Sequence, residues 1–264
     1  MLRYWVLLAS LFFTSYTLAD TAKYKIVIDD YSANKVDEII RTKVLPNAKA
    51  SEGDLISIVS SAFLQTPYQG QTLIGSQSEP EQLVVNFRGV DCFTLIDYVQ
   101  ALTKSDSRET FLQQLVKTRY NDGKVDYLNR RHFFSDWFNN APENARDVTP
   151  EISPNYLTAQ KHLNLKPGGG EYIPGLGVKL VDINYIPGYA IDREVLENLH
   201  NGDYVGVYSP MQGLDVTHTG IVIRKDDTVW FRNASSLAAN MKVVDTPFLD
   251  YMKSKPGIVV LRAN

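Results

Sequence analysis

The sequence predicts an α+β fold in which helices pack on an antiparallel sheet. Apolar helical segments dominate the first half of the chain, five strand-like runs follow residue 200, and short turns join those runs. Helices first and strands after are typical of α+β proteins, whereas a parallel βαβ fold would alternate them. The chain has 264 residues, 44% hydrophobic and 22% charged, which is ample for a substantial core.

Residues 1–19 have the features of a secretory signal peptide. The start "MLRY" carries a positive charge, the run "WVLLASLFF" is almost wholly apolar, and "TLA" offers small residues for cleavage after Ala19. The run is short for a bilayer span, and an uncleaved membrane anchor is the alternative. We therefore expect export to the periplasm or the medium, with no stable membrane association after cleavage.

The mature chain is mildly acidic and holds one cysteine. Without residues 1–19 it keeps 26 basic and 30 acidic side chains, a net charge of −4, which gives no support for nucleic-acid binding. Cys92 cannot form an internal disulfide, and a lone thiol in an exported protein suggests a use. An inert buried cysteine is the alternative.

The first half of the mature chain is predicted to be mainly helical. Period and composition give, in order, a strand at 23–30, a helix at 34–46 stopped by Pro46, a helix at 55–64, a loop at 65–75 and a strand at 81–87. We expect no internal repeat and no low-complexity tract to interrupt this order.

The cysteine opens the next helix. Asp91 is a good N-cap, and the following residues are helical to about Thr103. Cys92, Leu95, Ile96 and Val99 then form one apolar stripe, which we expect to pack inward.

The second half changes from helices to strands. A helix at 107–120 has plausible starts at Ser107 and Thr110, residues 121–154 are irregular, and 166–177 are turn-rich and interpreted as a flap. A helix at 193–203 is expected to end at Gly202. The five predicted strands follow at 203–209, 215–224, 228–235, 241–246 and 257–262.

A cysteine at a helix N-terminus is in a favourable place for nucleophilic chemistry. Unpaired backbone N–H groups and the helix dipole favour the thiolate and are expected to lower the pKa of Cys92. The same N–H groups can hold an oxyanion. A cysteine hydrolase also needs a base and a group that orients the base.

Among the four histidines, His218 is the predicted base. His200 follows a helix end, where capping or solvation is sufficient explanation. His162 looks like a surface helix position, and His132 is embedded among aromatic residues. His218 instead begins a strand beside Gly220, a residue that permits close approach of a substrate.

A hairpin brings a partner to this histidine. With residues 224–227 as the turn, Ile223 pairs with Thr228 and His218 lies opposite Asn233, within about 5 Å between Cβ atoms. A two-residue loop at 225–226 keeps the same register, whereas a loop with an odd number of residues would put the two side chains on opposite faces of the sheet. Asn233 can therefore orient the ring, although a strand-end turn residue is the alternative.

Four segments together resemble a known family. They are "RGVDCFTLIDYVQAL", "RRHFFSDW", "GLDVTHTGIVI" and "RNASSLA", and the loop "FLQTPYQGQTL" ahead of the cysteine fits as well. In this order they are similar to the N-acetylmuramoyl-L-alanine amidase-like family of papain-like cysteine hydrolases, akin to NlpC-type cell-wall peptidases. The resemblance runs from about Asp54 to the C-terminus.

The resemblance implies a single papain-like domain over 20–264, with 20–53 as an extension packed on it. It implies hydrolysis of the amide between N-acetylmuramic acid and L-alanine in peptidoglycan fragments, without a cofactor. Cys92 matches the nucleophile and His218 the base. Relatives often carry "HASS" where this chain has "NASS", so the third member here is Asn233.

Further residues are candidates for substrate binding. Asp91 adjoins the nucleophile, but its N-cap role is a sufficient explanation of its presence. An aromatic wall for a sugar or peptide is predicted from Tyr68, His132, Asp136 and Trp137, with core packing as the alternative.

Two kinds of group are not expected in the site. Asp215 is three residues before His218 and faces the other way by strand alternation, so it is not the predicted triad acid. No metal site is predicted, because the histidines lack ligand spacing and there is no second cysteine.

Two other functions stay open at this point. One is an endopeptidase that cuts within the peptidoglycan stem peptide. The other is a non-catalytic wall-binding protein of the same fold.

Overall fold

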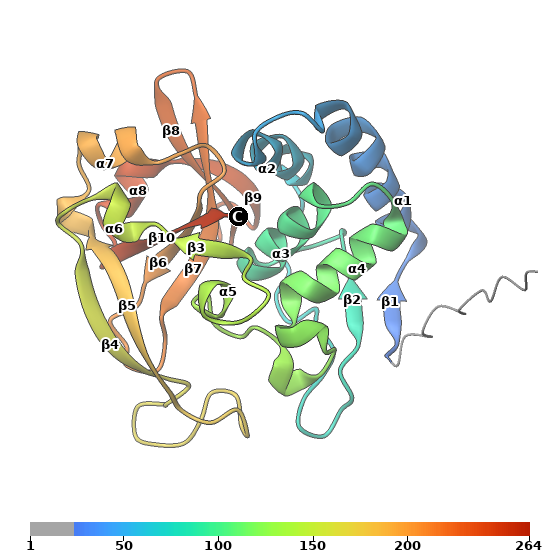
Figure 1. Ribbon diagram of the computed structural model, residues 1–264, viewed down its shortest axis with the longest axis horizontal. Helices are drawn as coiled ribbons and strands as arrows, with labels where there is room; N and C mark the ends of the chain where they lie inside the picture. The colour runs from blue at the N-terminus through green and yellow to red at the C-terminus, as the bar shows by residue number, and fades with distance from the viewer. Residues whose placement is uncertain (1–23) are drawn as a thin grey trace, which may run out of the picture.

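A layer of helices packs against an antiparallel sheet in the computed structural model, which describes residues 24–264 (Figure 1). The predicted signal peptide, 1–19, lies outside the described residues. Within 24–264, none of the helices combines the length and the apolar character needed to cross a bilayer.

The helical layer follows the predicted order closely. Its elements are β1 (Ile26–Ile28), α1 (Asp30–Ile39), α2 (Glu52–Ser60), β2 (Leu83–Val85), α3 (Cys92–Thr103) and α4 (Arg108–Arg119), and β1 pairs with β2 in parallel. Side chains of Asp29, Ser51, Asp91 and Ser107 accept N–H groups at the four helix starts. The first helix therefore begins at Asp30 rather than near residue 34, because Asp29 caps it. Thr110 is not a second start of α4 but completes the capping box of Ser107.

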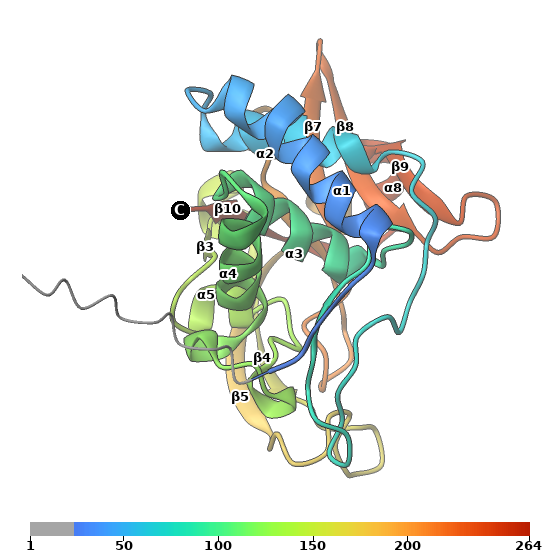
Figure 2. The same cartoon turned by 90° about the vertical axis from the view of Figure 1, so that its right-hand side faces the viewer.

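The cysteine helix α3 lies at the centre of the molecule. It contacts α2 and α4 on one side and β7 (Val216–Lys225) and β8 (Thr228–Ser235) on the other, and Figure 2 shows it below α2 and beside α4. Residues 94–102 are all buried, so α3 is enclosed all round rather than along the single predicted stripe. Only its two ends, Cys92 with Phe93 and Thr103, are partly exposed.

All five predicted C-terminal strands are present in the sheet. They are β6 (Tyr204–Tyr208), β7, β8, β9 (Lys242–Pro247) and β10 (Gly257–Ala263). The strand order is β4-β5-β10-β6-β7-β8-β9, every neighbouring pair is antiparallel, and β3 (Ala145–Asp147) pairs with β10 outside this path.

The long β4–β5 hairpin was not predicted from the sequence. It consists of β4 (Leu157–Leu163) and β5 (Lys179–Pro187), and His162 lies exposed on β4 rather than on a surface helix. Polar residues hide the strand pattern, since Lys161 is on the buried side. The Lys161 ammonium donates to the carbonyls of Ser209 and Met211 at 2.6 and 3.0 Å, which satisfies it without a carboxylate.

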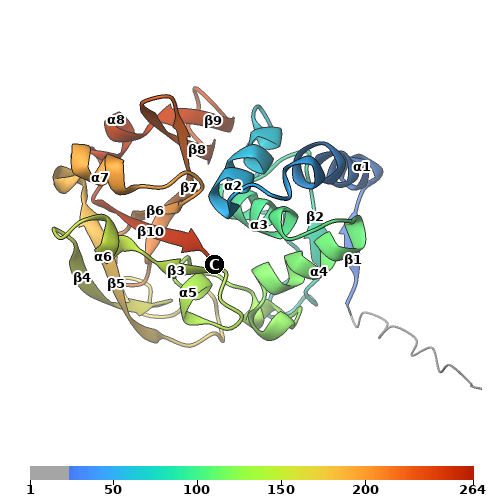
Figure 3. The ribbon, with the colours of Figure 1, turned by 45° about the horizontal axis from the view of Figure 1, so that its top comes forward.

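The sheet is covered on both faces. Along β10, Val259 and Leu261 face the core shared with α1 to α4, whereas Ile258 and Val260 face a second core. The second core is covered by α6 (Thr149–Ile152), α7 (Arg193–Asn198) and α8 (Phe248–Met252), which Figure 3 shows on the far side from α3. Helix α7 ends at Asn198, before the predicted stop at Gly202.

The turn-rich segment 166–177 is the loop of the β4–β5 hairpin. Its base is organised by buried Asn164, whose side chain bonds Ile173 and the carbonyl of Gly177. Three consecutive glycines at its tip, 168–170, have positive φ and would meet nothing within 4 Å if they carried a Cβ. The loop therefore needs glycine for its backbone conformation.

Candidate active site around Cys92

Cys92 is the first residue of α3, directly after its cap. One oxygen of the Asp91 carboxylate accepts the N–H groups of Phe93 at 3.1 Å and Thr94 at 2.7 Å. The N–H of Cys92 has no hydrogen-bond partner among the described residues. Of the helix-start donors expected to hold an oxyanion, two are thus taken by the cap, and the Cys92 N–H is the one left available.

The β7–β8 hairpin carries His218 and Asn233, but its register differs from the prediction. The turn is the two residues Asp226 and Asp227, with Asp226 at φ 54°, and Ile223 pairs with Trp230 rather than with Thr228. The turn lies nearer β8 than predicted because residues 224 and 225 continue β7, whereas β8 begins at Thr228 as predicted. Because the register differs from the prediction by an even number of residues, the side chains of His218 and Asn233 stay on one face of the hairpin. They are diagonal rather than directly opposite neighbours.

His218 and Asn233 are in direct contact. The distance from His218 Nε2 to Asn233 Oδ1 is 3.0 Å. The Asn233 amide nitrogen donates to Phe231 O at 3.1 Å and to Thr246 Oγ1 at 3.3 Å, which directs the amide oxygen toward the ring. Nε2 must then carry the proton, and Nδ1 is left as the proton acceptor of the imidazole.

Thr219 joins the histidine strand to the cysteine helix. Its hydroxyl donates to the carbonyl oxygen of Cys92 at 2.9 Å, and it directly follows His218. No hydrogen bond joins the Cys92 sulfur to the His218 ring among the described contacts. The structure therefore brings the backbone of the histidine strand to the start of the cysteine helix through Thr219, a residue that sequence reasoning missed.

The pKa of Cys92 moves against the sequence-based prediction. Burial and the negative charge of Asp91 raise the pKa of the thiol, while the backbone N–H and hydroxyl of Thr219 act in the opposite direction. The helix start does not dominate because burial of the thiol outweighs it, and the cap adds a carboxylate next to the sulfur. Cys92 is therefore a neutral thiol at neutral pH in the resting protein.

His218 is also held neutral. Burial lowers its pKa below 6.5, the positive charge of Lys255 adds to this, and the bond from Asn233 and the charge of Asp91 oppose it. The ring packs edge-on against Phe231, with centroids 5.9 Å apart. A neutral imidazole next to a neutral thiol is the starting state of a pair in which the proton moves during attack.

Two tyrosines flank the cysteine. Burial and then the charges of Cys92 and Asp91 raise the pKa of Tyr68, so this predicted residue is near the sulfur. Burial and then the charge of Cys92 raise the pKa of Tyr251, which was not predicted. Tyr251 lies on α8, a short helix that reaches the site only through the sheet topology, so no local sequence signal indicates it.

A family model matches residues 58–258 and is described as N-acetylmuramoyl-L-alanine amidase-like. The chain belongs to this family. The comparison with curated proteins gave no match.

Three solved structures are similar to this chain, and one of them is named an amidase. A Legionella pneumophila protein is 23% identical with a TM-score of 0.74, over 88% of this chain and 94% of that one, and shows the shared fold. An N-acetylmuramoyl-L-alanine amidase from Bacteroides uniformis is 30% identical with a TM-score of 0.67, over 81% and 99%. A protein from Bacteroides fragilis named a putative xylanase is 30% identical with a TM-score of 0.62, over 77% and 98%.

The remaining predicted wall of the amidase-like site is not in one place. Trp137 is fully buried against Phe93 and Tyr204, so it is a core residue and not a pocket wall. Asp136, on the short helix α5 (Asp136–Asn139), pairs with Lys179 at 3.4 Å beside a cavity of about 480 Å³. That cavity is lined by residues 135, 136, 139, 140 and 179–182 and not by Cys92 or His218.

His132 has a structural contact. Its Nε2 lies 2.8 Å from the carbonyl oxygen of Tyr127, and its ring packs edge-on against the Tyr127 ring. The carboxylate of Asp215 accepts the N–H groups of Ser135 and Val216, and the His218 ring is hydrogen-bonded instead to Asn233.

The burial of the His132 ring predicts that the stability of the protein depends on pH. Burial lowers its pKa to about 4, below the unfolded value of about 6.5, so the unfolded chain binds the extra proton. The stability this residue contributes is present above pH 6.5 and lost as the pH falls to about 4, by about 3 kcal/mol. Urea unfolding at pH 7 and pH 4 should show a larger loss for the wild type than for His132→Gln, which keeps a donor for Tyr127. Equal losses would contradict it.

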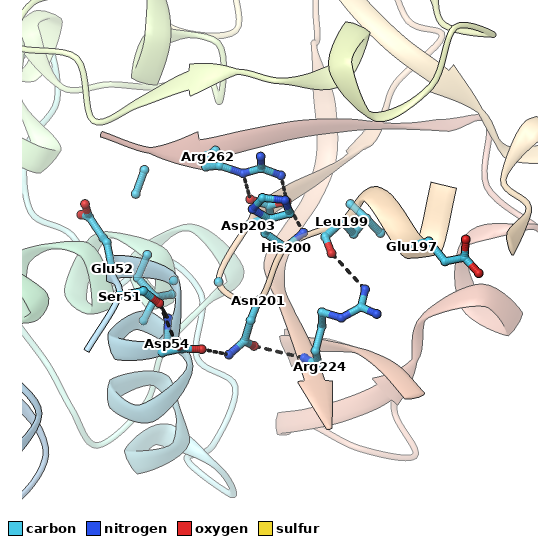
Figure 4. A pocket seen from close by; sticks show the side chains of 14 residues that line it. Ser51, Glu52, Asp54, Glu197, Leu199, His200, Asn201, Asp203, Arg224 and Arg262 are labelled. Atoms are coloured by element: carbon cyan, nitrogen blue, oxygen red, sulfur yellow. Dashed lines mark hydrogen bonds and ion pairs between the residues drawn. The ribbon is translucent and has the colours of Figure 1, made fainter. Parts of the chain in front are cut away.

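A cavity of about 520 Å³ is lined by His200 and not by Cys92 or His218 (Figure 4). It lies between the start of α2 and residues 199–203, and its polar groups bind one another: Asn201 bonds Asp54 at 2.9 Å, and Arg262 pairs with Asp203 at 2.7 Å. It is therefore a satisfied seam between helix and sheet. Within 24–264, no three or more His, Cys, Asp or Glu side chains are grouped to hold a metal ion.

Proposed function

We propose that the protein is a cysteine hydrolase that cleaves the amide between N-acetylmuramic acid and L-alanine in peptidoglycan fragments, with a papain-like, NlpC-type site. The observation that carries the proposal is the 3.0 Å contact between His218 on β7 and Asn233 on β8. The next residue on β7, Thr219, donates a hydrogen bond to the carbonyl oxygen of Cys92. Membership of the amidase-like family and the likeness to a Bacteroides uniformis amidase support the substrate.

The reaction begins with a neutral pair. His218 Nδ1 takes the thiol proton as the sulfur attacks the carbonyl carbon of the muramic lactyl group, and the N–H of Cys92 holds the oxyanion. His218 then donates this proton to the nitrogen of L-alanine, the C–N bond breaks, and a thioester remains on Cys92. Water, deprotonated by His218, attacks the thioester and releases the lactyl carboxylate.

The substrate in this scheme lies between the two flanks of the cysteine. Tyr68 and Asp91 on one flank offer a phenol and a carboxylate to the sugar or to an amine. Phe93 and the two tyrosines give the partly apolar surface that such ligands use. His132 and Asp136 form part of a separate surface around Lys179.

Carboxylate chemistry fits the cysteine site less well. A glycosidase such as the name of the Bacteroides fragilis relative suggests would use two carboxyl groups on either side of the bond. Asp91 is committed to two backbone N–H groups, and Asp215 is buried and bonded to the N–H groups of Ser135 and Val216. The cysteine amidase is therefore the preferred function over a glycosidase.

Defined muropeptides separate the amidase from its alternatives. Purified protein is incubated with a disaccharide tetrapeptide, and the products are weighed by mass spectrometry. Release of an intact stem peptide with a free L-alanine amine is expected. Cleavage after D-glutamate would make the protein an endopeptidase, and binding without cleavage would make it a wall-binding protein.

We also propose the setting of this reaction. Export to the periplasm or the medium would bring the enzyme to its substrate, and residues 20–264 would act as one domain with 20–53 packed on it. Residues Val36, Ile39, Ile40 and Val44 belong to the same core as α3, which supports the packing of this extension.

Removal of the orienting amide is expected to weaken catalysis without abolishing it. Asn233→Ala should lower kcat by about 10- to 100-fold with little change in KM, because the ring loses its orientation while substrate contacts remain. Steady-state kinetics on the muropeptide measure this. Asn155→Ala, at an exposed asparagine, is the control. An unchanged kcat in Asn233→Ala would show that another residue orients His218.

A further inference from the structure

A lysine is connected to the candidate active site through aromatic side chains. The Lys255 ammonium is 4.4 Å from the centre of the Tyr251 ring. Tyr251 stacks on Phe231 at 5.6 Å, and Phe231 packs against His218 at 5.9 Å. An unbroken series of ring contacts therefore leads from the catalytic histidine to this ammonium.

The positive charge of Lys255 is not matched by a nearby carboxylate. Among the ion pairs of residues 24–264, none includes Lys255. Its side chain is half-buried, and its charge helps to lower the pKa of His218, so the ammonium acts within the site rather than in bulk water. A half-buried ammonium without an anion beside a reactive centre is suited to an anionic ligand group.

The two flanks of the cysteine thus have opposite charge. Asp91 directly precedes Cys92, and Tyr68 pairs with Val90 just ahead of it, which makes the acidic flank. Lys255 lies over Tyr251, which reaches His218 through Phe231, and these two residues make the basic flank. A substrate that carries a carboxylate on one side of its scissile bond, and none on the other, is complementary to this arrangement.

We propose that Lys255 and Tyr251 form a subsite for a carboxylate of the stem peptide, namely the free α-carboxylate of the γ-linked D-glutamate. This inference rests on the proposed function. The acyl side of the muramoyl–L-alanine bond is a neutral N-acetylated sugar, so the nearest carboxylate is on the leaving-group side. It is two residues from the scissile carbonyl, within about 7 Å, a span that a lysine beside the histidine can meet.

Two matched substrates test the subsite. The γ-methylamide of N-acetylmuramoyl-L-alanyl-D-glutamate carries the α-carboxylate as its only charged group, and the γ-methylamide of the D-isoglutamine counterpart replaces it with a neutral amide of nearly the same shape. The wild type should prefer the acid by about ten-fold in kcat/KM, because a charge-assisted hydrogen bond is lost with the amide. Lys255→Met should bring this ratio close to one, and Lys255→Arg should keep most of it.

Several controls make the result decisive. Met retains the apolar stem of lysine over the Tyr251 ring, which protects the fold. Lys253→Met, at an exposed lysine two residues away, should leave the ratio at the wild-type value. A wild-type ratio near one, or a ratio that survives in Lys255→Met, would overturn the proposal.

Binding separates this inference from the proposed function. Dissociation constants of both compounds are measured with Cys92→Ala and with Cys92→Ala/Lys255→Met by calorimetry. If neither compound is cleaved by the wild type, the amidase proposal fails, while a ten-fold tighter binding of the acid that depends on Lys255 still supports the subsite. Equal binding of the two compounds, or no binding of either, overturns it.

Discussion

Replacement of Cys92 by alanine is expected to lower kcat on the muropeptide by about 10⁴-fold or more, because no other group in the site can form the thioester. The side chain is partly exposed and makes no side-chain hydrogen bond to His218, so its loss removes little packing. The variant should unfold within about 1 kcal/mol of the wild type. Single-turnover kinetics and urea unfolding on the same preparations measure the two effects.

A serine at this position is the matched comparison. Cys92→Ser keeps the size, the cap and the bond from Thr219 to the backbone carbonyl, which does not depend on the side chain. It should be nearly as inactive as the alanine variant, since the imidazole would have to deprotonate a far weaker acid. Substantial activity in either variant, with the fold intact, would exclude a thiol nucleophile.

The largest expected effect on stability comes from a buried ion pair on the cysteine helix. Asp97 of α3 and Arg119 of α4 meet at 2.8 Å with side chains only 2% and 1% exposed. Arg119 also donates to Val84 O at 2.8 Å and lies over the Tyr98 ring. Asp97→Ala should lower the free energy of unfolding by about 3–5 kcal/mol, because it leaves a buried guanidinium without its counter-charge. Urea unfolding measures the loss.

The double variant distinguishes an unpaired charge from lost packing. Asp97→Leu with Arg119→Met removes both charges and fills much of the volume, so it should recover most of the stability lost in Asp97→Ala. The pair already leaves Asp97 Oδ1 and Arg119 Nη2 buried without partners, which limits what it contributes. A double variant as unstable as the single one would show that the loss is one of packing.

The local features of the site were predictable because they depend on neighbours in sequence. Asp91 as cap and Cys92 at a helix start follow from side-chain chemistry within four residues. The pairing of His218 with Asn233 depends only on an even offset along one hairpin, so it survives a register that is wrong by two residues.

Features that depend on the tertiary structure were not predictable. Burial and the Asp91 charge decide the pKa of Cys92, and neither can be summed from the sequence. Tyr251 and Lys255 approach the site only because β8 and β9 carry α8 to it. The β4–β5 hairpin was missed because a buried lysine breaks the apolar alternation of its first strand. Trp137 was assigned to the pocket wall because the sequence does not show whether an aromatic side chain points into the core or into a pocket.

Charges of opposite sign act on the histidine of the site. Asp91 and Lys255 both act on His218, with opposite sign, and so the position of a charged substrate group would shift the basicity of the ring as it binds. A carboxylate beside Lys255 would raise the pKa of His218 and strengthen it as a base. Substrate recognition and proton transfer are in this way connected through one lysine.

Titration of the only cysteine tests the central claim most directly. The protein is treated with increasing methyl methanethiosulfonate at pH 9, where the raised pKa of Cys92 still allows thiolate to form, and each sample is divided between intact mass measurement and release of stem peptide from a muropeptide. We predict that activity falls in a straight line to zero at one methylthio group per chain and returns with dithiothreitol. Full activity in completely modified protein would contradict the account.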